Sequence, residues 1–145
     1  MKKLLKNRTG GFYLTFGASA AAFLGGIAYL AVYMATAGQA VDRVFSWLTL
    51  GMMLGGAVTG IVTEALRFRF GPIIVSVLFS VALANHLVES AYPLADVLTG
   101  VPFFGGNFTL ALIFAILFGL VAVCQVVSAF MEHNTIIGGK QNENA

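Results

Sequence analysis

Four long stretches without a charged side chain constrain the fold of this chain more than any other feature. Residues 9–41, 44–63, 70–88 and 97–131 contain no Asp, Glu, Lys or Arg. Each is close to, or longer than, the roughly 20 residues that a helix needs to cross a bilayer. The alternating segments typical of a transmembrane β-barrel are not seen in them. We therefore expect an all-α membrane protein with four transmembrane helices in one compact bundle.

We expect residues 1–145 to form a single transmembrane domain. Pro72 suits the first turn of the third span, where its missing N–H costs nothing. Pro93 is expected to end that span, because the residue before a proline disfavours helical backbone. Residues 93–107 would then form the longest connection, either an ordinary interfacial loop or a segment that re-enters the bundle. The predicted spans are about 12–34, 44–66, 72–92 and 108–131.

The basic residues predict an orientation. The chain has eight lysines and arginines, and all but Arg43 fall on one side of the membrane if the N-terminus is inside. Basic residues favour the cytoplasmic side, so we expect both termini in the cytoplasm and the 93–107 connection outside. A bacterial cytoplasmic (inner) membrane is the expected location. The basic residues on the cytoplasmic side are Lys2, Lys3, Lys6, Arg8, Arg67, Arg69 and Lys140.

Composition and motifs argue against soluble and enzymatic classes. Apolar residues make up 59% of the chain and charged residues only 10%, against about 25% charged in ordinary globular domains. The basic residues are explained by topology, so no nucleic-acid partner is expected. The single Cys124 excludes an internal disulfide framework. No GxSxG, P-loop, HExxH or dinucleotide motif is present, so we expect no enzyme activity and no cofactor.

The stretch Asn85 to Glu89 holds the polar groups of greatest interest. His86 and Glu89 are three residues apart, so they share one side of a helix. Ionisable groups within the membrane are costly and commonly mark functional sites. These two, with Asn85, could form a proton or cation relay or a polar ligand site near the extracytoplasmic face. The alternative is a structural His–Glu pair at a helix end.

Two further polar residues fall within spans. Glu64 precedes Arg67 by three residues, so it could pair with Arg67 or extend to the interface. It could instead be a second station on a path across the bundle, with Gln125 at a similar depth. Gln125 could equally form a hydrogen bond between helices. A metal site is not expected, because His86, Glu89 and one nearby aspartate give too few ligands.

Small residues at steps of four predict close helix packing. The second span contains two glycine pairs, Gly51/Gly55 and Gly56/Gly60, and the first contains Gly17 and Gly25. Hydrophobic attraction between helices is weak in lipid, so small residues that permit close van der Waals contact take its place. Whether these glycines face another span or another subunit is left open by the sequence.

We therefore expect a small integral membrane protein that is a non-catalytic subunit, or an accessory or assembly partner, of a membrane complex. Other membrane subunits or a homo-oligomer would be its partners, besides the lipid bilayer. The alternative is a small transporter or channel that uses His86 and Glu89; an intramembrane enzyme with His86 as base has less support. In length and number of spans the chain is similar to the small multidrug exporters, which carry a glutamate in the first span. Residues 12–34 contain no charge, so that function is not carried over.

Overall fold

Within the residues that the structure describes, four helices are each long and apolar enough to cross a membrane. The computed structural model describes residues 9–36, 44–103 and 105–131. The all-α fold class and the integral membrane character expected from the sequence are confirmed, and the bundle is compact. Of the basic residues that predict orientation, only Arg67 and Arg69 lie within the described ranges. The helices are α2 (Gly10–Ala35), α3 (Trp47–Ala65), α4 (Gly71–Thr99) and α5 (Phe108–Ala129).

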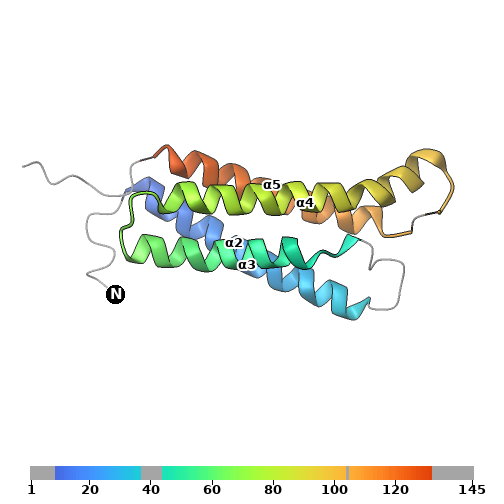
Figure 1. The fold of residues 1–145 in the computed structure, drawn as a ribbon, viewed down its shortest axis with the longest axis horizontal. Coiled ribbons are helices and arrows are strands. Elements are labelled where there is room, and N and C mark those ends of the chain that lie inside the picture. Colours follow the sequence, from blue (N-terminus) through green and yellow to red (C-terminus); the bar gives the residue numbers. More distant parts are fainter. Residues whose placement is uncertain (1–8, 37–43, 104, 132–145) are drawn as a thin grey trace, which may run out of the picture.

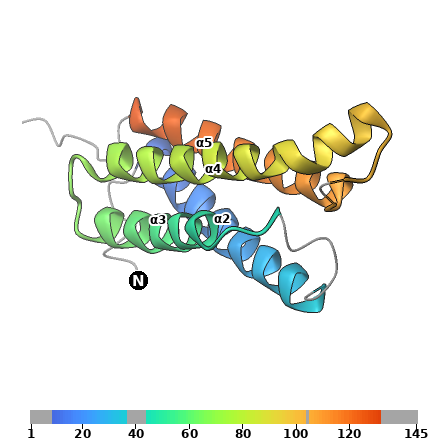
Figure 2. The same cartoon turned by 45° about the vertical axis from the view of Figure 1, so that its right-hand side comes forward.

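The helices form a closed, antiparallel ring in chain order. Each helix packs on its neighbours in sequence, and α2 also packs on α5 to close the bundle. Figures 1 and 2 show α2 crossing the other three helices obliquely, while α3, α4 and α5 run closer to a common direction. The tight α3–α4 connection begins at Arg67, whose φ of 56° is unusual for a residue other than glycine.

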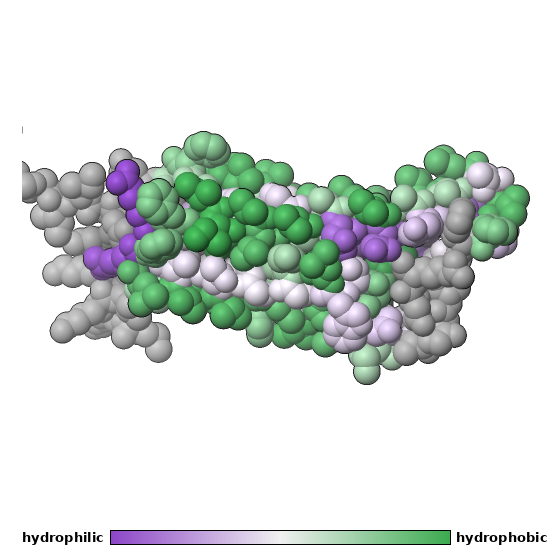
Figure 3. All heavy atoms as spheres, viewed as in Figure 1, coloured by the Kyte–Doolittle hydropathy of each residue, from purple (hydrophilic) through white to green (hydrophobic). Residues whose placement is uncertain are grey.

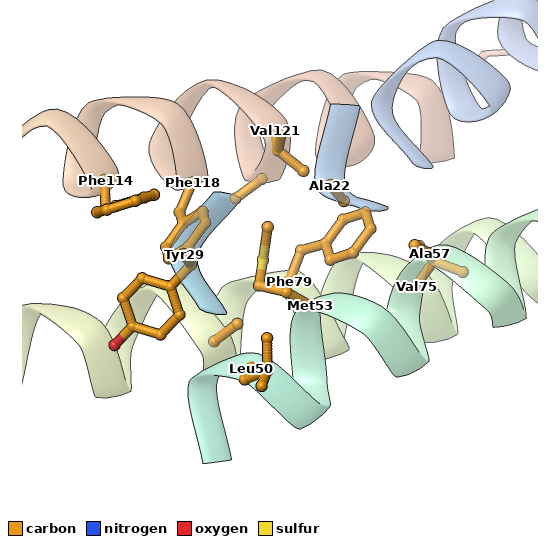
Figure 4. Packing of buried hydrophobic residues seen from close by; sticks show 12 residues of the cluster. Ala22, Tyr29, Leu50, Met53, Ala57, Val75, Phe79, Phe114, Phe118 and Val121 are labelled. Carbon is orange, nitrogen blue, oxygen red and sulfur yellow. The ribbon is translucent and has the colours of Figure 1, made fainter. Parts of the chain in front are cut away.

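Large side chains in the core pack against very small ones on the facing helices. Phe79, Phe118 and Met53 are fully buried, and Figure 4 shows them meeting between the helices. Phe79 lies against Gly56, where an added Cβ would come within 2.6 Å of its ring. The ring can therefore reach the α3 backbone only because position 56 lacks a side chain. The remaining core members are Ala22, Tyr29, Leu50, Ala57, Val75, Ala82, Phe114, Val121 and Ala122.

Pro93 does not end the third span, and that expectation is wrong. Helix α4 continues through Pro93 to Thr99 and ends at Gly100, whose φ is +68°. A proline removes only its own hydrogen-bond donor, and its bias against a preceding helical residue can be overcome by tertiary packing. Here the buried proline ring lies beside Gly106, where an added Cβ would be 3.3 Å away.

The connection between α4 and α5 is therefore shorter than residues 93–107. It spans residues 100–107, because the seven residues from 93 to 99 belong to the helix. The described residues Val101, Pro102 and Phe103 are exposed. The connection thus does not re-enter the bundle over these residues, and the re-entrant alternative is not supported. Asn107 then caps α5, its side-chain oxygen accepting a 3.1 Å hydrogen bond from the Leu110 amide.

The glycines proposed for packing separate into two groups. Gly25, Gly56 and Gly60 are buried between helices. An added Cβ at Gly25 would lie 2.9 Å from the Leu117 side chain, and one at Gly60 would overlap Ser19. Gly17, Gly51 and Gly55 are exposed, and an added Cβ at any of them would meet nothing within 4 Å. In the described part of the chain, the first group lies against other helices and the second does not.

Candidate functional site

His86 is the most deeply buried titratable side chain of the candidate set. It has no solvent exposure, and its Nε2 lies 3.0 Å from the carbonyl oxygen of Ala111 on α5. A carbonyl oxygen can only accept, so Nε2 carries the proton and the neutral ring leaves Nδ1 as a lone pair. That Nδ1 atom has no hydrogen-bond partner. His86 thus links α4 to α5 through one nitrogen and leaves the other unused.

Aromatic rings enclose the His86 imidazole. Its ring centroid lies 5.3 Å from that of Phe118, 5.7 Å from Tyr29 and 6.4 Å from Phe114, all with the planes close to perpendicular. Edge-to-face geometry of this kind is favourable for aromatic pairs. Three helices thus meet at this side chain, with Tyr29 from α2 and the two phenylalanines from α5.

The Tyr29 hydroxyl fixes the start of α3. It donates a 2.8 Å hydrogen bond to the Val44 carbonyl and accepts a 3.0 Å bond from the Ser46 amide. From the other side, Asn85 Nδ2 on α4 donates to the hydroxyls of Ser46, at 2.7 Å, and Thr49, at 2.9 Å. The α3 N-terminus is therefore held between α2 and α4 through Val44, Ser46 and Thr49.

Glu89 does not pair with His86. Within residues 9–36, 44–103 and 105–131, no hydrogen bond or ion pair joins the two side chains, and Glu89 is partly exposed. Three residues advance a helix by about 300°, so the two side chains diverge by about 60°. His86 reaches α5, and no bond from Glu89 to that helix is found among the described residues. The face in Figure 3 carries a hydrophilic patch toward this end of the bundle, between hydrophobic stretches.

Gln125 belongs to a second polar cluster nearer the Arg67 end. Its Nε2 lies 3.4 Å from the Thr15 hydroxyl and 3.3 Å from the Pro72 carbonyl. Thr15 and Ser128 hydroxyls are 2.6 Å apart, and Ser128 donates to the Gly11 carbonyl at 2.8 Å. Since the Ser128 proton is used there, Thr15 donates to Ser128. These bonds tie α2, α4 and α5 together, although Gln125 Oε1 lacks a partner.

Glu64 is almost fully buried, with 3% of its surface exposed. It lies in the last turn of α3, and its carbonyl oxygen accepts a 3.2 Å hydrogen bond from the Arg67 amide. The Gln125 side chain donates to Thr15 and Pro72. Among the described residues, no hydrogen bond joins it to Glu64.

An apolar layer separates the two polar clusters. Ala22, Met53, Phe79 and Phe118 have no exposed surface and belong to one packed cluster, which Figure 4 shows. Along α2, α4 and α5, Ala22, Phe79 and Phe118 lie between residues of the two polar clusters. Among the described residues, no chain of polar side chains crosses this layer. The described part of the protein also lacks any group of three or more His, Cys, Asp or Glu side chains able to hold a metal ion.

A small cavity adjoins the cluster around His86 and Tyr29. Its volume is about 20 Å³, and its lining includes Tyr29, Tyr33, Phe45, Ala111 and Phe114. That is room for about one water molecule. The cavity lies between the end of α2, the start of α3 and the start of α5.

Sequence reasoning missed Tyr29, Ser46 and Thr49 as parts of this site. Hydroxyl-bearing residues are spread through all four spans, so nothing in the sequence marks these three. The available signal was that a buried tyrosine hydroxyl usually finds a hydrogen-bond partner.

The comparisons with known proteins add no assignment. The chain matches no protein-family model, no curated protein and no solved structure.

Proposed function

We propose that this four-helix membrane protein is a non-catalytic subunit or assembly partner of a membrane complex. The observation that carries the proposal is the outward position of Gly51 and Gly55 on α3. An added Cβ at either glycine would meet nothing within 4 Å, whereas their neighbours Gly56 and Gly60 are buried in the bundle. Helix α3 thus carries more glycines than its contacts within this bundle require.

The outward face of α3 has the shape that helix association in lipid requires. Gly51 and Gly55 are flanked by Leu48, Val58 and Val62, which are 50%, 52% and 47% exposed. Two glycines beside larger side chains would let a second helix approach the backbone closely. Lipid tails would fill the open space at these glycines less completely than a complementary helix.

The buried polar groups support a structural role. His86, Asn85 and Gln125 all make hydrogen bonds that join different helices. In the described ranges, the apolar layer between the His86 and Gln125 clusters leaves no chain of polar side chains across the bundle. These groups therefore hold the helices in register, which is the property a scaffold or accessory subunit needs.

Purification in mild detergent followed by mass spectrometry tests this proposal. A stoichiometric partner, or a defined homo-oligomer, is expected for the unmodified chain. Gly51→Leu with Gly55→Leu should abolish the association while leaving insertion intact. Gly119→Leu is the matched control, because an added Cβ there also meets nothing within 4 Å but lies on α5. Unchanged association of the double variant would overturn the α3 assignment.

A small transporter or channel is the second candidate. The unpartnered His86 Nδ1 and the cavity of about 20 Å³ beside Tyr29 favour it. It also requires a second conformation in which the apolar layer opens. Flux assays in proteoliposomes, with His86→Gln and Glu89→Gln, test it: flux that disappears in both variants at normal protein abundance favours transport.

We also propose an orientation and a location. The seven basic residues on one side favour both termini in the cytoplasm of a bacterial cell, with the α4–α5 connection outside. A reporter enzyme that is active only in the cytoplasm, fused after Ala145, tests this orientation.

A further inference from the structure

The polar cluster around Gln125 receives groups from more than two helices. The helices form a closed ring in chain order, so α3 lies across the bundle from α5. The Gln125 amide nitrogen on α5 lies 3.4 Å from the Thr15 hydroxyl of α2 and 3.3 Å from the Pro72 carbonyl of α4. A side chain of α5 that reaches both flanking helices is directed toward the remaining helix, α3.

Glu64 is the residue that α3 presents at this level. It is 3% exposed and lies one turn beyond Gly60, which is also buried. At Gly60 an added Cβ would overlap the Ser19 hydroxyl of α2. Because α2 and α3 run antiparallel, the next turn of α3 lies at the level of Thr15, one turn from Ser19. Glu64 therefore faces the turn of α2 that the Gln125 amide also reaches.

Two oxygen atoms of this region are buried without a hydrogen-bond partner in the described part of the chain. They are Ser19 Oγ and Gln125 Oε1, and neither residue has any exposed surface. An amide oxygen can only accept, so it needs either a donor or a cation. A buried oxygen that binds neither costs free energy, and such atoms in a folded protein require an explanation.

The cluster is rich in acceptors. Thr15 donates its hydroxyl proton to Ser128, and Ser128 donates its own to a backbone carbonyl. Of the basic side chains that the structure describes, Arg67 and Arg69 are exposed, and His86 lies beyond the apolar layer. Oxygen lone pairs thus predominate over free donors where Ser19, Gln125 and Glu64 converge.

We propose that this cluster binds a sodium ion in the bundle, on the Arg67 side of the apolar layer. Gln125 Oε1 and Ser19 Oγ are its neutral ligands, and the Glu64 carboxylate is its charged ligand. Hard cations bind carboxylate, carbonyl and amide oxygens, and one carboxylate matches a monovalent ion rather than a divalent one. Ionisable groups within a membrane commonly mark ion sites. The site goes beyond the proposed function and is independent of the outward glycines of α3.

Sodium accounts for the cluster better than a proton does. A proton on Glu64 could be shared with one acceptor and would leave the second unpartnered oxygen unexplained. A sodium ion binds several oxygens at once, from side chains on α2, α3 and α5. The close approach of α2 and α3 at Ser19 and Gly60 also favours a small ion over potassium.

Thermal unfolding of the full chain in mild detergent tests the site. The protein is heated in NaCl and in choline chloride at equal ionic strength. Sodium alone should raise Tm, because a ligand that binds the folded state stabilises it. Glu64→Gln should remove this sodium-dependent rise. Glu89→Gln is the matched control, since it removes the carboxylate of α4 beyond the apolar layer and should keep the rise.

Variants of the neutral ligands separate binding from folding. Ser19→Ala and Gln125→Met should each raise the sodium concentration for half-maximal stabilisation at least about tenfold. Ser80→Ala, which changes an exposed serine of α4, should leave that concentration unchanged. A purely structural role of Ser19 or Gln125 would instead lower Tm equally in both salts, and that result would overturn the proposal.

Carbodiimide labelling in proteoliposomes locates the ion. A hydrophobic carbodiimide reacts with a protonated carboxyl group, so bound sodium should slow the labelling of Glu64 and potassium should not. Mass spectrometry of the peptide that contains Glu64 measures the rate on the unmodified chain, even if Glu64→Gln does not fold. Labelling that responds to pH and not to sodium would overturn the sodium site and indicate a proton site. An equal Tm in the two salts, or a sodium effect retained in Glu64→Gln, would also overturn it.

Discussion

His86 donates through Nε2 to the Ala111 carbonyl at 3.0 Å, and this bond joins α4 to α5 inside an enclosure of aromatic rings. Glu89, three residues further along α4, takes no part in it. The two ionisable groups nearest each other along α4 therefore have different roles. His86 is a buried structural link, and Glu89 is a partly exposed carboxylate near the end of the bundle.

The first prediction concerns this difference. His86→Ala should lower the free energy of unfolding by about 2–4 kcal/mol, because it removes a fully buried ring and its bond to Ala111. Glu89→Gln should change stability by less than about 0.5 kcal/mol, because no bond in the described residues depends on its charge. Unfolding in mixed micelles, followed by circular dichroism, measures both. Equal losses in the two variants would contradict the separation.

The Tyr29 hydroxyl should contribute measurably to stability. Tyr29→Phe removes its bonds to Val44 and Ser46 and is expected to cost about 1–2 kcal/mol, with the ring packing retained. Tyr33→Phe is the control, since no hydrogen bond of its hydroxyl is found among the described residues. The same unfolding assay applies, and the prediction fails if the two phenylalanine variants are equally stable.

Adjacent glycines on α3 should respond in opposite ways to alanine. Gly56→Ala brings a Cβ within 2.6 Å of the Phe79 ring and should destabilise the protein by about 1–3 kcal/mol. Gly55→Ala places its Cβ in open space and should be neutral or stabilise by up to about 1 kcal/mol, since alanine favours helix. Thermal denaturation of the two purified variants, compared with the wild type, gives the sign of each change.

The Thr15–Ser128 hydroxyl pair should be energetically coupled. A double-mutant cycle with Thr15→Val and Ser128→Ala is expected to give a coupling energy of about 0.5–1.5 kcal/mol. The reason is that the 2.6 Å bond between the two hydroxyls lies in the buried polar cluster around Gln125. Pairing Thr15→Val with Thr99→Ala provides a distant control with no coupling. A coupling energy of zero for the first pair would show that the hydroxyls act independently.

Asp96 should hold the α4–α5 connection in place. Asp96→Ala removes the acceptors for the Phe103 and Gly105 amides, so both amides should exchange with deuterium at least about tenfold faster. Thr99→Ala, which removes local bonds to the Ala95 and Asp96 backbone carbonyls and none to either amide, should leave their exchange unchanged. Hydrogen-exchange mass spectrometry of the peptide covering residues 100–107 reports both results.

The four helices were predictable from sequence because bilayer thickness sets their length. The continuation of α4 through Pro93 was not predictable, since the rule for residues before proline considers only neighbours in the chain. The packing of the proline ring beside Gly106 depends on two segments that meet only in the folded protein. Orientation of the helices about their own axes was equally hidden. Lipid is as apolar as the core, so a membrane helix gives little signal of which side faces inward.

The polar site shows the same limit. Spacing placed His86 and Glu89 on one side of a helix, but it could not say that His86 would meet α5 while Glu89 would not. The glycine pairs of α3 were equivalent in the sequence, although Gly56 packs inward and Gly51 faces outward. Which stripe faces the bundle depends on partners such as Phe79, whose distance from Gly56 no local pattern encodes.

The apolar layer formed by Ala22, Met53, Phe79 and Phe118 also has a consequence for the leakage of ions across the membrane. These side chains have no exposed surface, so the described bundle has no water-filled gap at their level. If the chain has the non-catalytic role proposed above, such a layer would keep the ion gradient of an energised membrane intact.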